Sequence, residues 1–325
     1  MQFAWGYAPT VIVASAVKHR LFDLLDNGPK TVDQLVKESG ASRRGVVALV
    51  DALTGLQLLA KSGDRFSLSP EAAAFLVSTK PGFFGAIFRH QVDDILPKWL
   101  ELDEVVRTGK PAQAVNAPGS SAGFFADFVE ALYPMSYPAV RALGDHLGIA
   151  SAKKPVGVLD LAAGSGVWGI TLAEQSPQVR ITAVDWPEVL EVTKRVAKQH
   201  GVADRLTPVP GDLLRVDFGQ GHQVATLGHI LHSEGRERSR QLLKKTCAAL
   251  TTGGTIAIAE FVPNDDRTGP PNALLFAVNM LVNTEAGDTF TFAEMSEWLR
   301  EAGFKDVRQL DTGAGPSPLL LGTKA

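Results

Sequence analysis

Three acidic residues in the second half of the sequence each lie at or just after the end of a short apolar run: Asp160, Asp185 and Asp212. Such runs are typical of strands that are buried on both faces of a parallel sheet. Because the carboxyl ends of parallel strands meet at one edge of a sheet, the three carboxylates are predicted to lie close together there. A carboxylate at the second of these strand ends has the chemistry to hold the two hydroxyl groups of a ribose.

A turn of small residues, Ala162-Ala163-Gly164-Ser165-Gly166, follows the first strand and precedes a predicted helix over 167–176. Glycine lets the backbone approach a ligand closely, and the free N–H groups at the start of a helix suit polar or anionic groups. Enzymes that bind a nicotinamide dinucleotide share this order of strand, glycine turn, helix and acid. The third acid, Asp212, follows a third strand at the same edge and argues against a dinucleotide.

Five segments then occur in a characteristic order: "VLDLAAGSG", "AVDWPEV", "GDLL", "HILH" and "ALTTGGTIAIAEFVP". In this order they resemble the small-molecule O-methyltransferases of the caffeate and bacterial polyketide type, and the resemblance spans nearly the whole chain. It implies S-adenosylmethionine (SAM) as the cofactor, S-adenosylhomocysteine as the product and a homodimeric enzyme. The implied fold is a Rossmann-like class I methyltransferase domain with a doubly wound, mostly parallel sheet, preceded by a mainly α winged-helix dimerisation domain.

The residues expected to bind the cofactor follow the three strands. Asp185 is expected at the ribose, and Asp212 with Leu213 near the adenine. The full expected set is Asp160, Gly164, Gly166, Asp185, Trp186, Gly211, Asp212 and Leu213. A sheet of the predicted order would gather these residues at one edge.

The resemblance also assigns His232, at the end of "HILH", as the general base and Glu260 as its acidic partner. An imidazole with a pKa near 6.5 is mostly neutral at neutral pH and can accept the proton of a phenol during methyl transfer. A carboxylate on the other ring nitrogen would fix the tautomer and favour the imidazolium. The alternative is a histidine that caps a helix beside an unrelated glutamate.

Three places depart from the pattern of this family. Ser233 and Glu234 replace the usual Asp-Trp after the histidine, and Gly228 replaces a common lysine. Thr289 stands where a second acidic partner is usual, with Asp288 one residue away. Some relatives with the same cofactor perform hydroxylation, decarboxylation or rearrangement, so chemistry other than O-methylation is an open alternative.

The methyl acceptor is expected to be a small, aromatic hydroxyl compound. The predicted helices of residues 81–150 are rich in aromatic side chains, and ligand pockets commonly lie where domains meet. The residues expected to line the acceptor site are Phe128, Tyr133, Met135, Ser136, His229, Asn279 and Met280, the last two through the resemblance. His229 and His232 are three residues apart, but further ligands at a suitable spacing are missing, so no metal site is predicted.

A chain of 325 residues is longer than most single cores, so more than one domain is expected. Residues 1–80 are predicted to form the winged-helix dimerisation domain, 81–150 a helical connector that carries pocket helices, and 151–325 the SAM-binding methyltransferase domain. An apolar helix over 9–25 is expected to pack against a second copy of the chain. A winged helix reads DNA in many proteins, but the nearly balanced charges of residues 1–80 disfavour a SAM-responsive regulator that binds DNA.

The composition is ordinary for a globular protein, with 45% hydrophobic and 21% charged residues and a net charge of −3. Neither nucleic acid nor an anionic membrane is indicated as a partner, and no stretch reaches the length of a membrane span. The single cysteine, Cys247, excludes an internal disulfide framework. The composition therefore favours a cytoplasmic protein. The resemblance implies that its partners are a small-molecule acceptor and a second copy of the chain.

Overall fold

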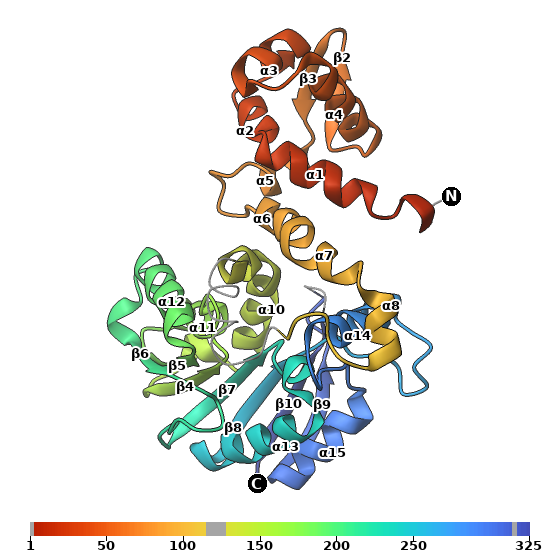
Figure 1. Cartoon of the computed structure of the whole chain (residues 1–325). Helices are drawn as coiled ribbons and strands as arrows, with labels where there is room; N and C mark the ends of the chain where they lie inside the picture. Colours follow the sequence, from red (N-terminus) through yellow and green to blue (C-terminus); the bar gives the residue numbers. More distant parts are fainter. Residues whose placement is uncertain (1–2, 115–127, 314–316) are drawn as a thin grey trace. The chain divides into compact units, whose positions relative to one another are not determined.

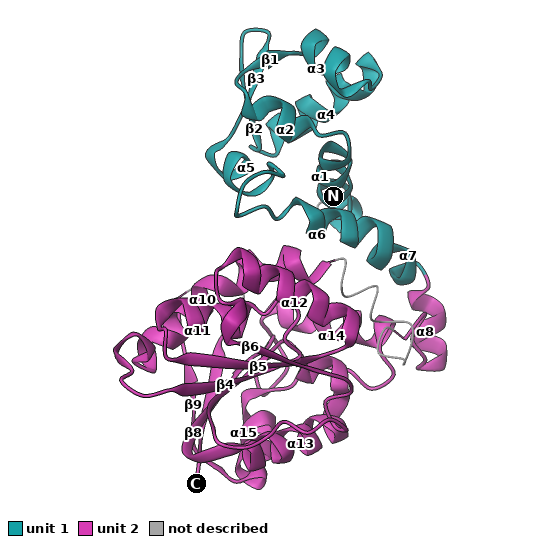
Figure 2. Cartoon of the chain, turned by 90° about the vertical axis from the view of Figure 1, so that its left-hand side faces the viewer, with its two compact units in different colours: residues 1–100 teal, residues 101–325 magenta. Residues whose placement is uncertain are grey.

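The computed structural model describes residues 3–114, 128–313 and 317–325. The chain forms two compact units, residues 1–100 and residues 101–325, which Figure 2 shows in different colours. The predicted connector over 81–150 is divided between these units, since residues 81–100 belong to unit 1 and the remainder to unit 2.

Unit 1 consists of short helices and a small antiparallel sheet of strand order β1-β3-β2. Its strands are β1 (Lys30–Thr31), β2 (Leu59–Ser62) and β3 (Arg65–Leu68). Its helical segments are η1 (Phe3–Trp5), α1 (Ala8–Lys18), α2 (Leu21–Asp26), α3 (Val32–Ser39), α4 (Arg43–Gly55), α5 (Pro70–Phe75), α6 (Gly85–His90), η2 (Gln91–Ile95) and α7 (Leu96–Trp99). Strands β2 and β3 form the wing that the sequence predicts after the second helix of the pair α3 and α4.

Hydroxyl side chains begin the two helices of this pair. Thr31 and Gln34 form a reciprocal capping box at the start of α3, and Ser42 Oγ accepts a hydrogen bond from the backbone of Gly45 at the start of α4. The predicted helix over 9–25 is wrong as a single helix. Arg20 adopts a left-handed backbone conformation (φ 57°), which ends α1 and begins α2 in a new direction.

Unit 2 is a seven-stranded sheet with helices on both faces, and this arrangement confirms the predicted doubly wound α/β class. Its strands are β4 (Val156–Leu161), β5 (Val179–Asp185), β6 (Leu206–Pro210), β7 (His222–Gly228), β8 (Leu250–Ala259), β9 (Phe304–Leu310) and β10 (Leu319–Lys324). Its helical segments are α8 (Leu102–Thr108), η3 (Val129–Leu132), α10 (Tyr133–His146), η4 (Ile149–Ser151), α11 (Val167–Gln175), α12 (Pro187–Gln199), η5 (Ala203–Arg205), α13 (Leu231–Ala249), α14 (Pro271–Asn283) and α15 (Phe292–Ala302).

The strand order is β6-β5-β4-β7-β8-β10-β9, and only β10 runs opposite to the other strands of the sheet. Successive residues of each buried strand point to opposite faces, so the sheet separates two apolar cores. Helices α10, α11 and α12 cover one face, and α13 and α15 cover the other (Figure 1). The chain moves from β4 to β5 on one side and later to β7 on the other, so the sheet has its switch point at β4.

Glycine residues disturb two elements of unit 2. Gly235 interrupts helix α13 with non-helical angles (φ 74°, ψ 171°). Strand β8 contains the pair Gly253 and Gly254. A Cβ at Gly254 would lie 2.9 Å from the carbonyl oxygen of Thr251, so the strand irregularity at this point requires glycine. Within the described ranges, no helix is long and apolar enough to cross a membrane.

Replacement of Gly169 by alanine should destabilise the protein, although alanine normally favours a helix interior by up to about 1 kcal/mol. A Cβ at this position of α11 would lie 2.6 Å from Cγ2 of Ile181 in β5 and 3.1 Å from the Asp160 carboxylate. We expect Gly169→Ala to lower the free energy of unfolding by about 1–3 kcal/mol, measured by urea denaturation. Gly55→Ala, at the end of α4 where an added Cβ meets nothing within 4 Å, is the control and should not destabilise. A Gly169→Ala protein as stable as wild type would contradict this close packing.

Candidate functional site

Five parallel strands of unit 2 end at one edge of the sheet, and the predicted site residues follow them directly. The register aligns Leu161 with Val184, Asp185 with Pro210, and Gly228 with Ala259, so the ends of β4 to β8 are level. Asp185 is the last residue of β5, and the segments after the other strand ends carry the glycine turn, Asp212, the histidine pair and Glu260. In an open α/β sheet this edge, beside the switch point, is where ligands bind.

The glycine turn after β4 depends on left-handed backbone angles. Gly164 and Gly166 have φ values of 57° and 79°, and even Ala162 lies at 52°. A Cβ at Gly166 would lie 2.8 Å from side-chain atoms of Ile170 and Thr193, so glycine is also required for packing against α11 and α12. The backbone of this turn is therefore held in one conformation at the edge of the sheet.

Asp160 lies beneath the turn and is fully buried. Its Oδ2 accepts a hydrogen bond from the Gly169 N–H (2.9 Å), and its Oδ1 accepts one from the Thr226 hydroxyl (2.8 Å). Burial raises the pKa of this carboxyl to about 7. Both oxygens are thus engaged by the protein, so Asp160 joins β4, α11 and β7.

Asp185 is half-buried at the end of β5 and contacts the turn directly. Its two oxygens accept hydrogen bonds from the backbone N–H groups of Gly164 (2.9 Å) and Trp186 (2.7 Å). Its carbonyl oxygen accepts a bond from the Gly211 N–H (2.9 Å), which brings the third strand end alongside. Burial raises the pKa of the Asp185 carboxyl to about 6. The predicted ribose-binding acid is therefore next to the glycine turn.

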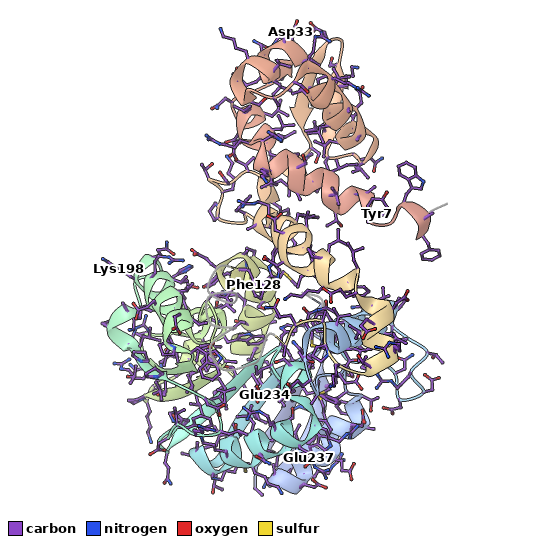
Figure 3. The ribbon with its side chains drawn as sticks, in the orientation of Figure 1. Tyr7, Asp33, Phe128, Lys198, Glu234 and Glu237 are labelled. Atoms are coloured by element: carbon purple, nitrogen blue, oxygen red, sulfur yellow. The ribbon has the colours of Figure 1, made fainter. Side chains whose placement is uncertain are left out.

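Asp212 belongs to an ionic network that the sequence does not predict. One of its oxygens accepts a hydrogen bond from the Leu214 N–H (2.8 Å), and the other pairs with Arg238 (3.2 Å). Arg238 also binds Glu234 (2.6 Å), a half-buried residue labelled in Figure 3 whose pKa is raised by burial. Glu234, which is one of the two residues that replace the family's Asp-Trp, is thus linked through Arg238 to Asp212, the acid expected near the adenine. Leu213 is buried next to them.

The structure brings the predicted pair His232 and Glu260 together. His232 Nδ1 lies 2.7 Å from Oε2 of Glu260, and the His232 backbone N–H lies 3.3 Å from Oε1. Both side chains are buried. Burial raises the pKa of the Glu260 carboxyl, but the attraction of His232 and its hydrogen bonds outweigh this and hold the pKa below its usual range. Nε2 of His232 has no hydrogen-bond partner among the described residues.

Two phenylalanines that the sequence analysis did not select surround the histidines. Phe276 of α14 packs edge-on against the His232 ring, with 4.8 Å between centroids. Phe261 lies 4.3 Å from Phe276 and 5.2 Å from His229 by the same measure. Helical periodicity gives no sign that Phe276 contacts His232, because an apolar residue in an apolar helix is normally part of the core. The aromatic rings give the His232 imidazole an apolar environment.

The segment after α14 packs under His232 but supplies no second acid. The backbone N–H of Asp288 donates to the His232 carbonyl oxygen (2.9 Å), whereas its carboxylate pairs with Arg267 (3.1 Å). Thr289 is buried, and its hydroxyl has no hydrogen-bond partner within the described part of the chain. Asp288 therefore does not take the place of the missing acidic partner.

A small cavity opens beside this group. It is lined by Met135, Ser136, Ala139, Trp168, His229, Ala259 and Ser317, which come from α10, from the start of α11 and from the ends of β7, β8 and the segment before β10. Gly228 allows Trp168 to take this position, because a Cβ there would overlap the indole nitrogen. His229 Nε2 lies 2.9 Å from the Ser317 hydroxyl. Met135, Ser136 and His229 are thus expected acceptor-site residues that do line a cavity.

Four other residues expected at the acceptor site do not line this cavity. The Tyr133 hydroxyl lies 3.3 Å from that of Thr171, its ring stacks on His200 (4.9 Å), and burial raises its pKa. Asn279 accepts a hydrogen bond from Asn283 (3.1 Å), and Met280 is buried within α14. Phe128, labelled in Figure 3, is half-buried immediately before η3. The described residues contain no group of three His, Cys, Asp or Glu that could hold a metal ion.

Comparison with known proteins supplies the family. Residues 145–305 match the O-methyltransferase domain, and residues 1–78 match the O-methyltransferase dimerisation domain. The 3-hydroxy-5-methyl-1-naphthoate 3-O-methyltransferase of Streptomyces sahachiroi is 30% identical, over 99% of this chain and 94% of the relative.

Solved structures share the fold over almost the whole chain. A protein of Nostoc punctiforme assigned to the O-methyltransferases has a TM-score of 0.89 at 27% identity, covering 99% of this chain and 97% of that chain. Human N-acetylserotonin methyltransferase in complex with SAM has a TM-score of 0.85 at 23% identity, covering 100% and 96%, which shows a shared fold. The chain therefore belongs to the O-methyltransferases with an N-terminal dimerisation domain, and it is a SAM-dependent O-methyltransferase.

Proposed function

We propose that the protein methylates a hydroxyl group of a small aromatic acceptor, with His232 as the general base and Glu260 as the residue that orients it. The observation that carries this proposal is the 2.7 Å contact between His232 Nδ1 and the buried Glu260 carboxylate, which leaves Nε2 available for a proton. The Streptomyces sahachiroi relative acts, by its name, on a hydroxyl of a naphthoate, which is an acceptor of the same class.

The residues at the strand ends fit a SAM molecule. A half-buried carboxylate beside a glycine turn has the chemistry to accept hydrogen bonds from a ribose diol, and Asp185 is such a carboxylate. Gly164, Gly166 and Trp186 would hold the cofactor next to it, and Gly211, Asp212 and Leu213 would adjoin the adenine. Asp160 would act through the turn, by fixing the Gly169 N–H. When bound, SAM supplies a methyl group already activated on a sulfonium.

The Glu260 carboxylate determines which nitrogen of His232 carries the proton. A carboxylate with a lowered pKa is ionised at neutral pH and accepts a hydrogen bond from Nδ1–H, so the lone pair lies on Nε2. Nε2 can then take the proton of the acceptor hydroxyl as the methyl group is transferred. The same carboxylate stabilises the imidazolium that forms. Because Thr289 replaces a second acid, this stabilisation comes from one carboxylate.

Positioning contributes the other part of the rate. A nucleophile held in near-attack geometry can gain up to about 7–11 kcal/mol relative to reaction in dilute solution. Phe261 and Phe276 surround the histidine with apolar surface, which favours a flat acceptor ring and excludes water from the reacting oxygen.

Removal of the imidazole by His232→Ala should lower the rate of methyl transfer by roughly 10²–10⁴-fold, the usual contribution of a positioned base. The affinity for S-adenosylhomocysteine should stay near wild type, because the expected cofactor residues lie on other loops. Glu260→Gln should cost less, since it keeps the base and weakens only the control of its tautomer. Single-turnover rates with radiolabelled SAM and calorimetry measure the two properties.

A His232→Ala enzyme that keeps most of its rate would show that positioning alone suffices, and the role of general base would be lost. Loss of cofactor affinity in the same variant would indicate a structural role for the histidine.

The affinity for S-adenosylhomocysteine should depend on pH through Asp185. Its carboxyl has a pKa of about 6, so it is ionised above pH 6 and increasingly protonated below. Only the ionised form accepts hydrogen bonds at both oxygens, so affinity should fall, by up to about tenfold per pH unit, as the pH drops from 6 to 5. Calorimetry between pH 8 and pH 5 measures this, and Asp185→Asn should flatten the profile. If Asp160→Asn flattened it instead, the titrating group would be the acid beneath the turn, whose pKa is raised to about 7.

We further propose that the protein is a homodimer through its first domain. Phe3, Trp5 and Tyr7 are 98%, 64% and 59% exposed, and Tyr7 is labelled at the start of α1 in Figure 3. Large apolar side chains gathered in one exposed segment are typical of an interaction surface. Light scattering should give about twice the 34.7 kDa chain mass at micromolar concentration. Combined replacement of Phe3 and Trp5 by serine should shift the mass toward the monomer, and a monomeric wild-type protein would refute the proposal.

A further inference from the structure

We propose that His229 and Ser317 form a second recognition point in the acceptor cavity, for a neutral oxygen that lies next to the hydroxyl to be methylated. The acceptor is accordingly an aromatic compound with two neighbouring oxygens, the second being a hydroxyl or a carbonyl. This inference rests on the proposed function, since it takes the hydroxyl at His232 as the reacting group.

The backbone of His229 is held in an unusual conformation. It has a φ of 60°, in the left-handed region that residues other than glycine rarely adopt. Its N–H donates to the carbonyl oxygen of Ala259 (2.9 Å), so the histidine is fixed at the end of β7 beside the end of β8. Strained backbone that the surrounding structure maintains is concentrated at functional sites, and here it turns the imidazole into the wall of the cavity.

Each of the two histidines has one nitrogen held by the protein. Glu260 engages Nδ1 of His232, and Ser317 engages Nε2 of His229 at 2.9 Å. In the described ranges, neither Nε2 of His232 nor Nδ1 of His229 has a hydrogen-bond partner. The ring centroids are 6.4 Å apart. In the proposed complex, the two neighbouring oxygens of one small aromatic molecule each form a hydrogen bond of about 2.8 Å, one with each of these nitrogens.

The surroundings of His229 favour a neutral oxygen over a carboxylate. Burial lowers the pKa of His229 to about 4, so its imidazole is uncharged at neutral pH. The charged or titratable groups that act on it are Glu260 and His232, and the described lining of the cavity contains no lysine or arginine. A second carboxylate would therefore lie near that of Glu260 without a cation to balance it.

The remaining walls are apolar. Met135 and Ala139 of α10, Ala259 of β8 and the buried Trp168, which lies against Gly228, supply them. The pair His229 and Ser317, with Ser136, supplies the polar atoms. A pocket with apolar walls and few polar groups gains its specificity from those polar groups.

The test compares two probes that differ by one oxygen, 2,3-dihydroxynaphthalene and 2-naphthol. Calorimetry on the full-length protein saturated with S-adenosylhomocysteine should show that the diol binds more tightly by about tenfold to a hundredfold, because 2-naphthol leaves the buried pair without a partner. His229→Gly removes the imidazole and suits the positive φ, and it should bring the ratio of the two affinities close to one. Ser317→Ala should lower the ratio less. His146→Ala, at an exposed histidine beside Arg308, is the control and should keep the wild-type ratio.

Several results would overturn the inference. These are equal affinity of the wild-type protein for the two probes, no binding of the diol at millimolar concentration, an unchanged ratio in His229→Gly, or tighter binding of 3-hydroxy-2-naphthoate than of the diol. If His229→Gly does not fold, Ser317→Ala decides in the same way. Transfer of radiolabelled methyl to the diol is scored separately. If the ratio of the two affinities depends on His229 but no methyl group is transferred, only the proposed function is refuted. If methyl transfer depends on His232 but the two affinities are equal, only this inference is refuted.

Discussion

The arrangement of the active edge depends on a single buried carboxylate. Asp160 holds the Gly169 N–H and the Thr226 hydroxyl at once, so it fastens the first helix after the glycine turn to the two central strands. A buried carboxylate is tolerated only when its oxygens are paired, and here both oxygens are. Because these hydrogen bonds fix the residues beneath it, the glycine turn keeps its left-handed backbone angles. The half-buried Asp185 then binds the turn from the neighbouring strand.

The part of the edge that carries His232 has fewer acidic residues than the family pattern contains. One carboxylate, Glu260, contacts both the backbone N–H and the ring of His232. The segment that usually brings a second acid still packs under the histidine, but through the backbone N–H of Asp288. The buried Thr289 hydroxyl stays without a partner in the described structure. In its proposed role as the base, His232 is oriented by Glu260, and its charge is stabilised by this one carboxylate.

The other departures from the family pattern are coupled to changes elsewhere in the structure. Gly228 leaves space that the Trp168 indole occupies, so the indole becomes part of the cavity wall. Glu234 binds Arg238, and Arg238 binds Asp212, so Glu234 is linked to the segment that follows β6. In both cases an unusual residue is explained by a residue distant in the sequence, which is Trp168 for Gly228 and, through Arg238, Asp212 for Glu234.

The sequence by itself determined the doubly wound sheet and the strand ends that carry Asp160, Asp185 and Asp212. These follow from local patterns, since apolar runs, glycine turns and the ends of parallel strands have fixed consequences. The pairing of His232 with Glu260 was implied by the family resemblance, and the structure brings the two side chains together. Only the tertiary structure decided which side chains meet the cavity. Ser317 and Phe276 enter the site, and Tyr133 packs against Thr171 and His200 instead. The physical reason is that an aromatic or hydroxyl side chain looks alike in a core and in a pocket, and only the packing of distant elements distinguishes the two.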